Sequence, residues 1–298
     1  MGAGQKGALS VGFFASVDGE VVPAEEARVS VLDNGFTFGD SVYETLRTYG
    51  GRPFRLDRHL QRLRASAGRL GIAVPLGDPE LGARLDAVLA RAGNPESYIR
   101  LLVTRGRGDI SYNFDRVKGP TVVMVVKPYQ PYPEQHFRDG VDVIISSVRR
   151  NHPQALDPAI KSCNLLNNIL AVREAQARGA AEALLLNHAG DVAEGASTNV
   201  FVVRSGAVVT PPLDAGILAG ITRDVVLALA PRLGLVAREE RLSVPDLRGA
   251  DEAFLTSTTR ELAPVRAIDG RPVGSGKPGP TTLRLLAAFR EEAAQAAR

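Results

Sequence analysis

The chain has 298 residues, 44% hydrophobic and 23% charged, a composition typical of globular proteins and unlike that of disordered or fibrous ones. Its formal net charge of +3 is too small to indicate a nucleic-acid partner. The single cysteine, Cys163, excludes an internal disulfide and a cysteine-based zinc site. Because the four histidines are also scattered, we expect no metal centre.

No targeting or membrane segment is evident. The N-terminal sequence MGAGQKGALSVGFF lacks both the cationic lead-in and the long apolar stretch of a signal peptide. No stretch approaches the roughly 20 apolar residues that a membrane helix needs. We therefore expect a cytoplasmic protein that makes no membrane contact.

The first third of the chain predicts strands, then two helices, then strands again. Three β-type runs come first: Ser10–Ala15, Arg28–Leu32 and Val42–Tyr49. Asp57 is expected to cap a helix with leucines at helical spacing, and Gly71 is expected to end it. A second helix should open at Asp78 and Pro79 and end at Gly93.

Two further strands, Tyr98–Thr104 and Thr121–Val126, enclose the polar loop RGRGDISYNFDRVKGP. Loops of that length tend to be functional or mobile. The proline-rich stretch Lys127–Gln135 then predicts an interdomain linker.

Beyond the linker, the pattern alternates strands and helices irregularly. The predicted strands are Val141–Val148, Ala183–Asn187, Phe201–Val203, Ala207–Thr210 and Glu252–Thr256, and the predicted helices are Asn164–Arg178 and Ile221–Leu235. We predict an α+β protein of two domains. The small N-terminal α/β domain spans residues 1–126, the linker 127–135, and the larger β-rich C-terminal domain 136–298.

Two local motifs offer reactive groups. In AIKSCNLLNN, Lys161 comes just before a predicted helix, and a catalytic amine needs poor solvation to be nucleophilic near neutral pH. In GDVAEGASTNVF, Glu194 offers a carboxylate that can hold a cationic ring nitrogen by a charge-assisted hydrogen bond. Taken singly, a solvated surface lysine and an ordinary turn are the commoner interpretations.

Two other motifs offer anion sites. In LAGITRDVV, Ile221 and Thr222 open a helix, whose first N–H groups are free to bind an anion. In LTSTTREL, Ser257 and Thr258 crowd a strand end with hydroxyl groups. A simple helix start and a polar turn are again the commoner interpretations. Arg62, in the first helix, can supply a matching cation, whereas the nearby His59 is better explained as a packed or capping residue.

Together these motifs supply an amine, an acid, a phosphate cradle and an arginine, which is the set that a pyridoxal 5'-phosphate (PLP) site requires. With these motifs, the chain resembles the fold-type IV PLP enzymes: branched-chain aminotransferases, D-amino-acid aminotransferases and aminodeoxychorismate lyases. The resemblance runs from about residue 12 to residue 289. Its motifs, in order, are DNGFTFGDSVYETLR, RLDRHLQRL, IKSCNLLNN, AEGASTNVF, GILAGITRDVV and FLTSTTRELAPV.

The resemblance implies a role for each matching position. Lys161 would bond covalently to the cofactor and shuttle the proton, and Glu194 would face its ring nitrogen. The phosphate-binding residues would be Arg62, Ile221, Thr222, Ser257 and Thr258. Leu218 would pack against the ring. The substrate side would be lined by Tyr43, Tyr98, Arg100 and Thr259. The resemblance also implies a homodimer and amino-acid and keto-acid substrates.

The assignment to a subfamily depends on fewer residues. Tyr98 and Arg100 look like the Tyr-x-Arg strand of branched-chain aminotransferases. The D-amino-acid enzymes bind the carboxylate with an Arg and a His in the loop after VTRG, where this chain has Ile110 and Tyr112. Arg105 and Arg107 are the possible substitutes, and the STTRE segment looks more like the D-amino-acid enzymes.

We therefore expect transamination between a branched-chain L-amino acid and a 2-keto acid such as α-ketoglutarate. D-amino-acid transamination and elimination of pyruvate by a lyase are the alternatives. A PLP-binding module without activity is a further alternative, which the presence of both Lys161 and Glu194 disfavours.

Overall fold

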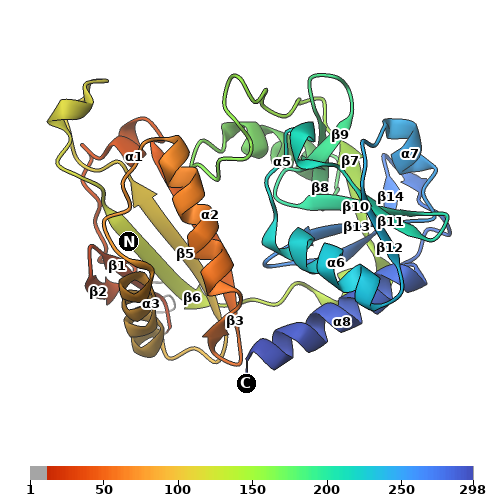
Figure 1. Ribbon diagram of the computed structural model, residues 1–298, viewed down its shortest axis with the longest axis horizontal. Coiled ribbons are helices and arrows are strands. Elements are labelled where there is room, and N and C mark those ends of the chain that lie inside the picture. The colour runs from red at the N-terminus through yellow and green to blue at the C-terminus, as the bar shows by residue number, and fades with distance from the viewer. Residues whose placement is uncertain (1–11, 298) are drawn as a thin grey trace, which may run out of the picture. The chain divides into compact units, whose positions relative to one another are not determined.

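The computed structural model describes residues 12–297, which form two compact units of mixed helix and sheet (Figure 1). Unit 1 comprises the chain up to Gln130, the short segment Ile160–Asn164 and the C-terminal end from Ala296. Unit 2 comprises Pro131–Ala159 and Leu165–Gln295. The two-domain α+β expectation is confirmed. The segment with Lys161, however, belongs to unit 1 and not to the C-terminal part, because it pairs with a strand of unit 1.

Unit 1 is built on a six-stranded sheet with the order β2-β1-β6-β5-β3-β4, in which all neighbours are antiparallel. The strands are β1 (Phe14–Val17), β2 (Glu20–Pro23), β3 (Ser41–Tyr49), β4 (Arg52–Pro53), β5 (Ser97–Thr104) and β6 (Val122–Pro128). The helices are α1 (Asn34–Thr37), α2 (Leu56–Arg69), α3 (Asp78–Ala92) and a 3-10 turn at Phe114–Arg116.

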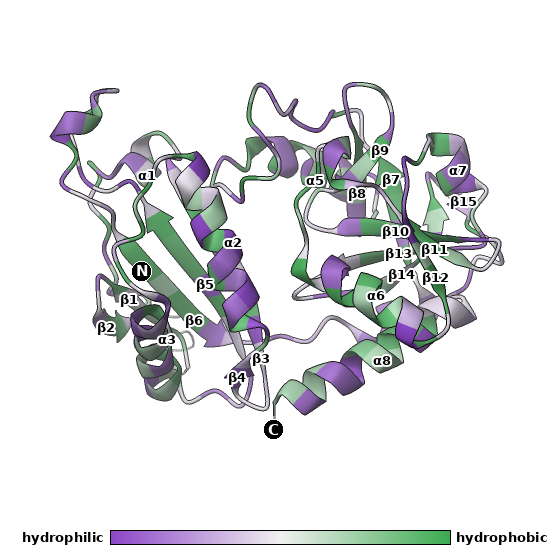
Figure 2. Ribbon diagram, in the orientation of Figure 1, coloured by the Kyte–Doolittle hydropathy of each residue, from purple (hydrophilic) through white to green (hydrophobic). Residues whose placement is uncertain are grey.

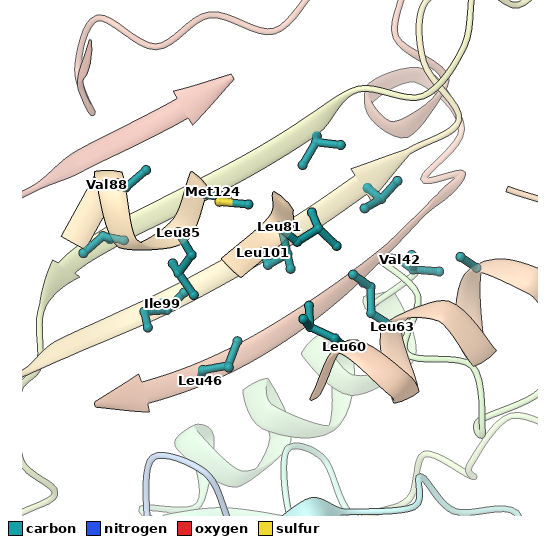
Figure 3. Packing of buried hydrophobic residues seen from close by; sticks show 14 of the residues in the cluster. Val42, Leu46, Leu60, Leu63, Leu81, Leu85, Val88, Ile99, Leu101 and Met124 are labelled. Carbon is teal, nitrogen blue, oxygen red and sulfur yellow. The ribbon is translucent and has the colours of Figure 1, made fainter. Parts of the chain in front are cut away.

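The period-2 pattern of β3 decides which face of this sheet is buried. Val42 and Leu46 point into the core, and α2 and α3 cover that face with apolar residues such as Leu63 and Leu85 (Figure 3). In Figure 2, α2 is hydrophobic along one side and hydrophilic along the other, as its leucine spacing predicts. The other face of β3 and β5 stays partly exposed and is free to carry polar residues.

Unit 2 contains a nine-stranded sheet with the order β12-β11-β10-β13-β14-β7-β8-β9, and β15 pairs with β14. Its strands are β7 (Val141–Ile145), β8 (Glu182–Leu186), β9 (Val192–Gly195), β10 (Asn199–Arg204), β11 (Ala207–Thr210), β12 (Val236–Glu239), β13 (Glu252–Ser257), β14 (Glu261–Ile268) and β15 (Arg271–Pro272). Its helices are α4 (Glu134–Asp139), α5 (Leu166–Ala177), α6 (Ile221–Arg232), α7 (Val244–Arg248), α8 (Pro280–Ala296) and a 3-10 turn at Leu213–Ala215.

Most residues of the central strands of unit 2 are buried on both faces, as expected of a sheet covered on both sides. All five residues of β8 are buried, and α5 packs on it. On a neighbouring part of the sheet, α6 contacts both β12 and β13. The rings of Phe201 and Phe254, from adjacent strands, stack with their centroids 4.9 Å apart.

Two sequence-based predictions are wrong in detail. Arg28–Leu32 is not a strand, since no neighbouring strand pairs with it and Val31 is 69% exposed. Asp57 does not cap α2, because Arg55 takes the capping position with a positive φ and leaves Asp57 in the first turn. There its negative charge still favours the helix N-terminus. Of the Ser10–Ala15 run, Ser10 and Val11 lie outside the described residues.

The predicted linker Lys127–Gln135 is also shorter than its prolines suggest. Strand β6 continues through Pro128, which pairs with Ser97 at the edge of the ladder, and α4 already begins at Glu134. The boundary between the compact units falls between these two elements. Within residues 12–297, the search for a helix long and apolar enough to span a bilayer finds none.

Candidate active site

The segment Ile160–Asn164 runs antiparallel along the beginning of β3. The N–H of Tyr43 donates to the carbonyl of Lys161 (2.9 Å), and the N–H of Cys163 donates to the carbonyl of Ser41 (3.0 Å). The N–H of Lys161 donates in turn to the hydroxyl of Ser66 on α2 (3.2 Å). The backbone of Lys161 is therefore fixed by two elements of unit 1 and is not a mobile loop.

The half-buried face of β3 and β5 brings together three of the residues predicted for the substrate side. Tyr43 alternates with the inward residues of β3, and Tyr98 and Arg100 lie at matching positions of β5. The Nζ atom of Lys161 lies 4.6 Å from the centre of the Tyr43 ring, and Cζ of Arg100 lies 4.0 Å from it.

These contacts place the Arg100 guanidinium and the Lys161 amine against one aromatic ring, and a cation over such a ring is stabilised when it is shielded from water. Burial raises the pKa of the Tyr43 hydroxyl, although the nearby Arg100 opposes that change. Within residues 12–297, no carboxylate pairs with the Arg100 guanidinium. A half-buried guanidinium with no anion of its own is suited to bind the carboxylate of a small molecule.

On the opposite, buried face of β3, Glu44 meets two residues of α2. Arg62 binds the Glu44 carboxylate in a bidentate arrangement, with Nε 2.7 Å from one oxygen and Nη2 2.8 Å from the other. Nδ1 of His59 lies 2.7 Å from the same group. Burial alone would raise the pKa of Glu44, but the Arg62 charge and the two hydrogen-bonding partners lower it to about 2.

The same packing lowers the pKa of His59, mainly through burial and in spite of Glu44. The expectation of a packed histidine is therefore met, since the His59 side chain is only 1% exposed. Arg62 was predicted as a cation for a phosphate. In this structure its fork faces Glu44, so a bound anion would share the guanidinium with that carboxylate.

In unit 2, Glu194 lies on β9 with its side chain only 6% exposed. One oxygen accepts from Nε of Arg150 (2.8 Å). The other accepts from the backbone N–H of Leu218 (3.0 Å) and from the side-chain amide of Asn199 (3.2 Å). A guanidinium, a backbone N–H and a side-chain amide thus hold this carboxylate in one orientation, as an acid with a directional role requires.

Asn199 also fixes the start of α6. Its amide donates to the carbonyl of Leu218 (3.0 Å), and a Cβ added at Gly220 would come within 1.9 Å of its Oδ1 atom. A side chain at position 220 would therefore displace the Asn199 amide. Gly220 is the N-cap and no side chain caps the helix, so the first N–H groups of Ile221 and Thr222 lack partners within the helix. Such a helix start is suited to bind an anion.

The hydroxyl-rich motif forms the turn between β13 and β14. Ser257 pairs with Glu261, which leaves Thr258, Thr259 and Arg260 as a three-residue turn. The Thr256 hydroxyl, at the end of β13, is buried and has no hydrogen-bond partner among the described residues. Because Asn199 lies opposite Thr256 in the sheet, this turn and the start of α6 belong to the same neighbourhood of unit 2.

The two arginines suggested as carboxylate anchors in the 105–120 loop differ sharply. Arg105 forms an ion pair with Asp40, donates to the carbonyl of Leu70 (2.7 Å) and stacks on Phe114. Its donors are therefore largely taken, and its suggested role as a substitute anchor is not supported. Arg107 is exposed.

Three residues of the candidate site were not predicted from the sequence: Glu44, Arg150 and Asn199. Glu44 had a usable signal, since a carboxylate at an inward position of an apolar strand needs a cationic partner. Asn199 lies in the GDVAEGASTNVF motif, whose polar end is typical of an ordinary turn, and no sequence motif singles out Arg150. Among residues 12–297, no group of three or more His, Cys, Asp or Glu side chains could hold a metal ion.

Comparisons with known proteins identify the family of the chain. The family model described as amino-transferase class IV matches residues 41–268. The chain is 37% identical to a D-alanine aminotransferase of Bacillus licheniformis, covering 92% of this chain and 94% of that protein. It is 36% identical to a branched-chain-amino-acid aminotransferase of Salmonella typhimurium, covering 91% and 90%.

A solved structure is similar as well. The crystal structure of the branched-chain amino acid aminotransferase from Thermobaculum terrenum in its PLP form matches with a TM-score of 0.85 and 30% identity. The match covers 95% of this chain and 94% of that one.

The pKa of Glu44 leads to a prediction about acid stability. A carboxyl group with a lowered folded-state pKa stabilises the protein above its unfolded pKa, and this contribution is lost as the pH falls through the folded value. The decrease from 4.5 to about 2 corresponds to roughly 3 kcal/mol at neutral pH, at about 1.4 kcal/mol per unit. We expect Glu44→Gln to lose about that much free energy of unfolding at neutral pH.

Urea denaturation at a series of pH values measures the effect. The difference between wild type and Glu44→Gln should shrink as the pH falls below the unfolded value of 4.5. Glu80→Gln, at the exposed Arg84 pair, is the matched control and should change little at any pH. A Glu44→Gln difference that stays constant from neutral to acid pH would contradict the assignment.

Proposed function

This chain belongs to the class IV aminotransferase family, and we propose that it transfers the amino group of a branched-chain L-amino acid to a 2-keto acid, with PLP bound covalently at Lys161. One observation carries the proposal. The Lys161 amine and the Arg100 guanidinium lie against the same Tyr43 ring, so a reactive nitrogen and a carboxylate-binding cation share one face of unit 1.

The residues present are suited to PLP. The uncapped start of α6, with Ile221 and Thr222, and the hydroxyls of Ser257 and Thr258 would bind the phosphate. The buried Thr256 hydroxyl, which has no partner among the described residues, offers a further polar group in that neighbourhood.

Three further residues would hold the rest of the cofactor. Arg62 would add positive charge while it remains paired with Glu44. Leu218 would pack against the ring, and its N–H orients Glu194, which would face the ring nitrogen.

When bound, PLP supplies an electron sink that stabilises negative charge at the substrate Cα. The chain's own residues do the rest. Lys161 would hold the cofactor covalently and then carry the proton to and from the substrate Cα as a general base and acid. Its fixed backbone limits the positions that the amine can reach. Glu194, locked by three donors, would keep the ring nitrogen protonated.

The substrate side would be formed by Tyr43, Tyr98, Arg100 and Thr259. Arg100 would bind a substrate carboxylate, and the aromatic rings would border an apolar side chain. The D-amino-acid alternative is supported by the near-equal identity to a D-alanine aminotransferase. It is weakened by the loop, because Ile110 and Tyr112 offer no charge and Arg105 is bound to Asp40.

We also propose that two copies form a homodimer in the cytoplasm. The dimer surface would consist of Val31, Phe36, Ile110, Tyr112 and Phe114, which are large hydrophobic side chains that are all exposed. The two segments that carry them are adjacent, since the N–H of Gly108 donates to the carbonyl of Leu32 and Phe38 contacts Tyr112. An apolar surface of this kind is typical of a protein–protein interface.

Lys161→Ala tests the chemistry. Without the amine, the protein should lose both the absorption band of the covalently bound cofactor and essentially all transamination, since the proposal assigns both the covalent bond and the proton transfer to Lys161. Absorption spectroscopy and a coupled keto-acid assay measure the two effects. Lys277→Ala, at an exposed lysine, is the control and should retain both. Retention of turnover in Lys161→Ala would contradict the proposal.

A substrate panel tests the specificity. We expect kcat/KM for L-leucine and L-valine with α-ketoglutarate to exceed the value for D-alanine by at least about tenfold, a typical discrimination for an apolar pocket. Aminodeoxychorismate without a keto acid tests the lyase alternative and should give no pyruvate. If D-alanine is the best substrate, or if pyruvate forms without an acceptor, the branched-chain assignment is wrong.

Phe36→Asp tests the dimer surface. A charge buried in an interface has a large desolvation cost, so this variant should sediment as a monomer at micromolar concentration while the wild type sediments as a dimer. Phe36 is 73% exposed, so the fold of the single chain should tolerate the change. Leu283→Asp, an exposed leucine on α8, is the control. A wild type that sediments as a monomer would exclude the dimer.

A further inference from the structure

The turn between β13 and β14 contains an unusual backbone conformation. Glu261, the first residue after the turn, has φ +53, in the left-handed region that residues with side chains rarely adopt. Glycine would fit this position without strain. A strained residue of this kind persists only where its surroundings hold it in place. Two ion pairs hold it in place: one is formed by Arg260, the last residue of the turn, and the other by Glu261 itself.

The first ion pair joins Arg260 to Glu182. Nη1 of Arg260 lies 2.9 Å from Oε2 of Glu182, the first residue of β8, whose side chain is only 1% exposed. The same carboxylate accepts from the hydroxyl of Ser197 (2.6 Å) and from the N–H of Ala183 (3.0 Å). Glu182 therefore connects the β13–β14 turn to the turn that follows Glu194.

The second ion pair joins Glu261 to α8. Nε of Arg290 donates to the Glu261 carboxylate over 2.7 Å, and the Glu261 side chain is 8% exposed. The turn itself is closed by the N–H of Arg260, which donates to the Ser257 hydroxyl (3.2 Å). Consecutive residues of the chain are thus anchored to two different elements of unit 2, and Thr258 and Thr259 lie in the turn just before these anchors.

We propose that Arg260 is a positioning residue, which through its ion pair with Glu182 holds the Ser257–Thr259 turn in the conformation that binds the cofactor phosphate. This inference rests on the proposed function. Arg260 acts through the turn and is not itself a phosphate ligand, because its guanidinium faces the buried Glu182 carboxylate. The arrangement preorganises the hydroxyl and N–H groups of the turn, so that binding an anion costs little further ordering.

Arg260→Ala and Arg260→Lys test the proposal, with PLP as the probe. Loss of one charge-assisted hydrogen bond corresponds to about a tenfold change in affinity, so the PLP dissociation constant of Arg260→Ala should rise by about that factor. The phosphorus NMR signal of bound PLP should shift as well, since the phosphate surroundings change. Arg260→Lys keeps the charge but loses the planar fork, and it should recover part of the affinity.

The control is Arg266→Ala, on the same strand. Arg266 pairs with Asp142 through two hydrogen bonds of 2.7 and 2.8 Å, but the pair is exposed. This variant should bind PLP as the wild type does. Melting of the cofactor-free proteins separates positioning from general destabilisation. A purely structural role of Arg260 would lower the melting temperature and leave the phosphorus signal of the folded fraction unchanged.

The outcomes are distinct. A wild-type dissociation constant and an unshifted phosphorus signal in Arg260→Ala overturn the inference, even if PLP binds at Lys161 as proposed. If Arg260→Ala does not fold, the same two readouts on Arg260→Gln decide, because glutamine removes the charge but can still hydrogen-bond, and a wild-type pattern there again overturns it. A wild-type protein that binds no PLP removes the proposed function and this inference together.

Discussion

The hydrogen bond from the N–H of Tyr43 to the carbonyl of Lys161 is the contact on which the candidate active site depends. It joins β3 to a segment that follows it by more than a hundred residues, and the Val42–Ser162 bridge makes it part of a short antiparallel ladder. Without this ladder, the lysine would lie in an irregular connection. With it, the amine lies beside the same ring that Arg100 contacts, on the face that the core leaves open.

Each compact unit contains a buried carboxylate, and the chain orients the two by the same means. Glu44 is held by Arg62 and His59, and Glu194 by Arg150 together with an amide and a backbone N–H. Buried ion pairs contribute little net stability, since desolvation offsets most of the attraction between the charges. Their value here is orientation: each carboxylate has most of its acceptor positions filled, so it cannot rotate away.

How much of this could be predicted depends on the range of the interactions. The strand Val42–Tyr49 was predictable because buried and exposed residues alternate along it. The helix beginning at Asp78 was predictable because a proline marks its start and a glycine its end. Both patterns are local in the sequence. Lys161, Glu194 and the hydroxyl-rich turn at Ser257 and Thr258 were predicted from their motifs. The assignment of Lys161 to unit 1 was not predictable, because it depends on pairing with a distant strand. Arg28–Leu32 failed for the opposite reason: its local pattern suits a strand, but no partner strand exists beside it.

The path of the chain has a consequence for how such a protein can change during evolution. The backbone leaves unit 1 after Gln130, returns for the five residues Ile160–Asn164, and comes back once more at Ala296. Neither unit is therefore a continuous stretch that could be exchanged by recombination as a cassette. A genetic fusion that replaced everything before Gln130 would keep the codon of the lysine but discard the strand that orients it. New specificities are expected to arise from point substitutions on the open face of β3 and β5, and not from swapping of modules.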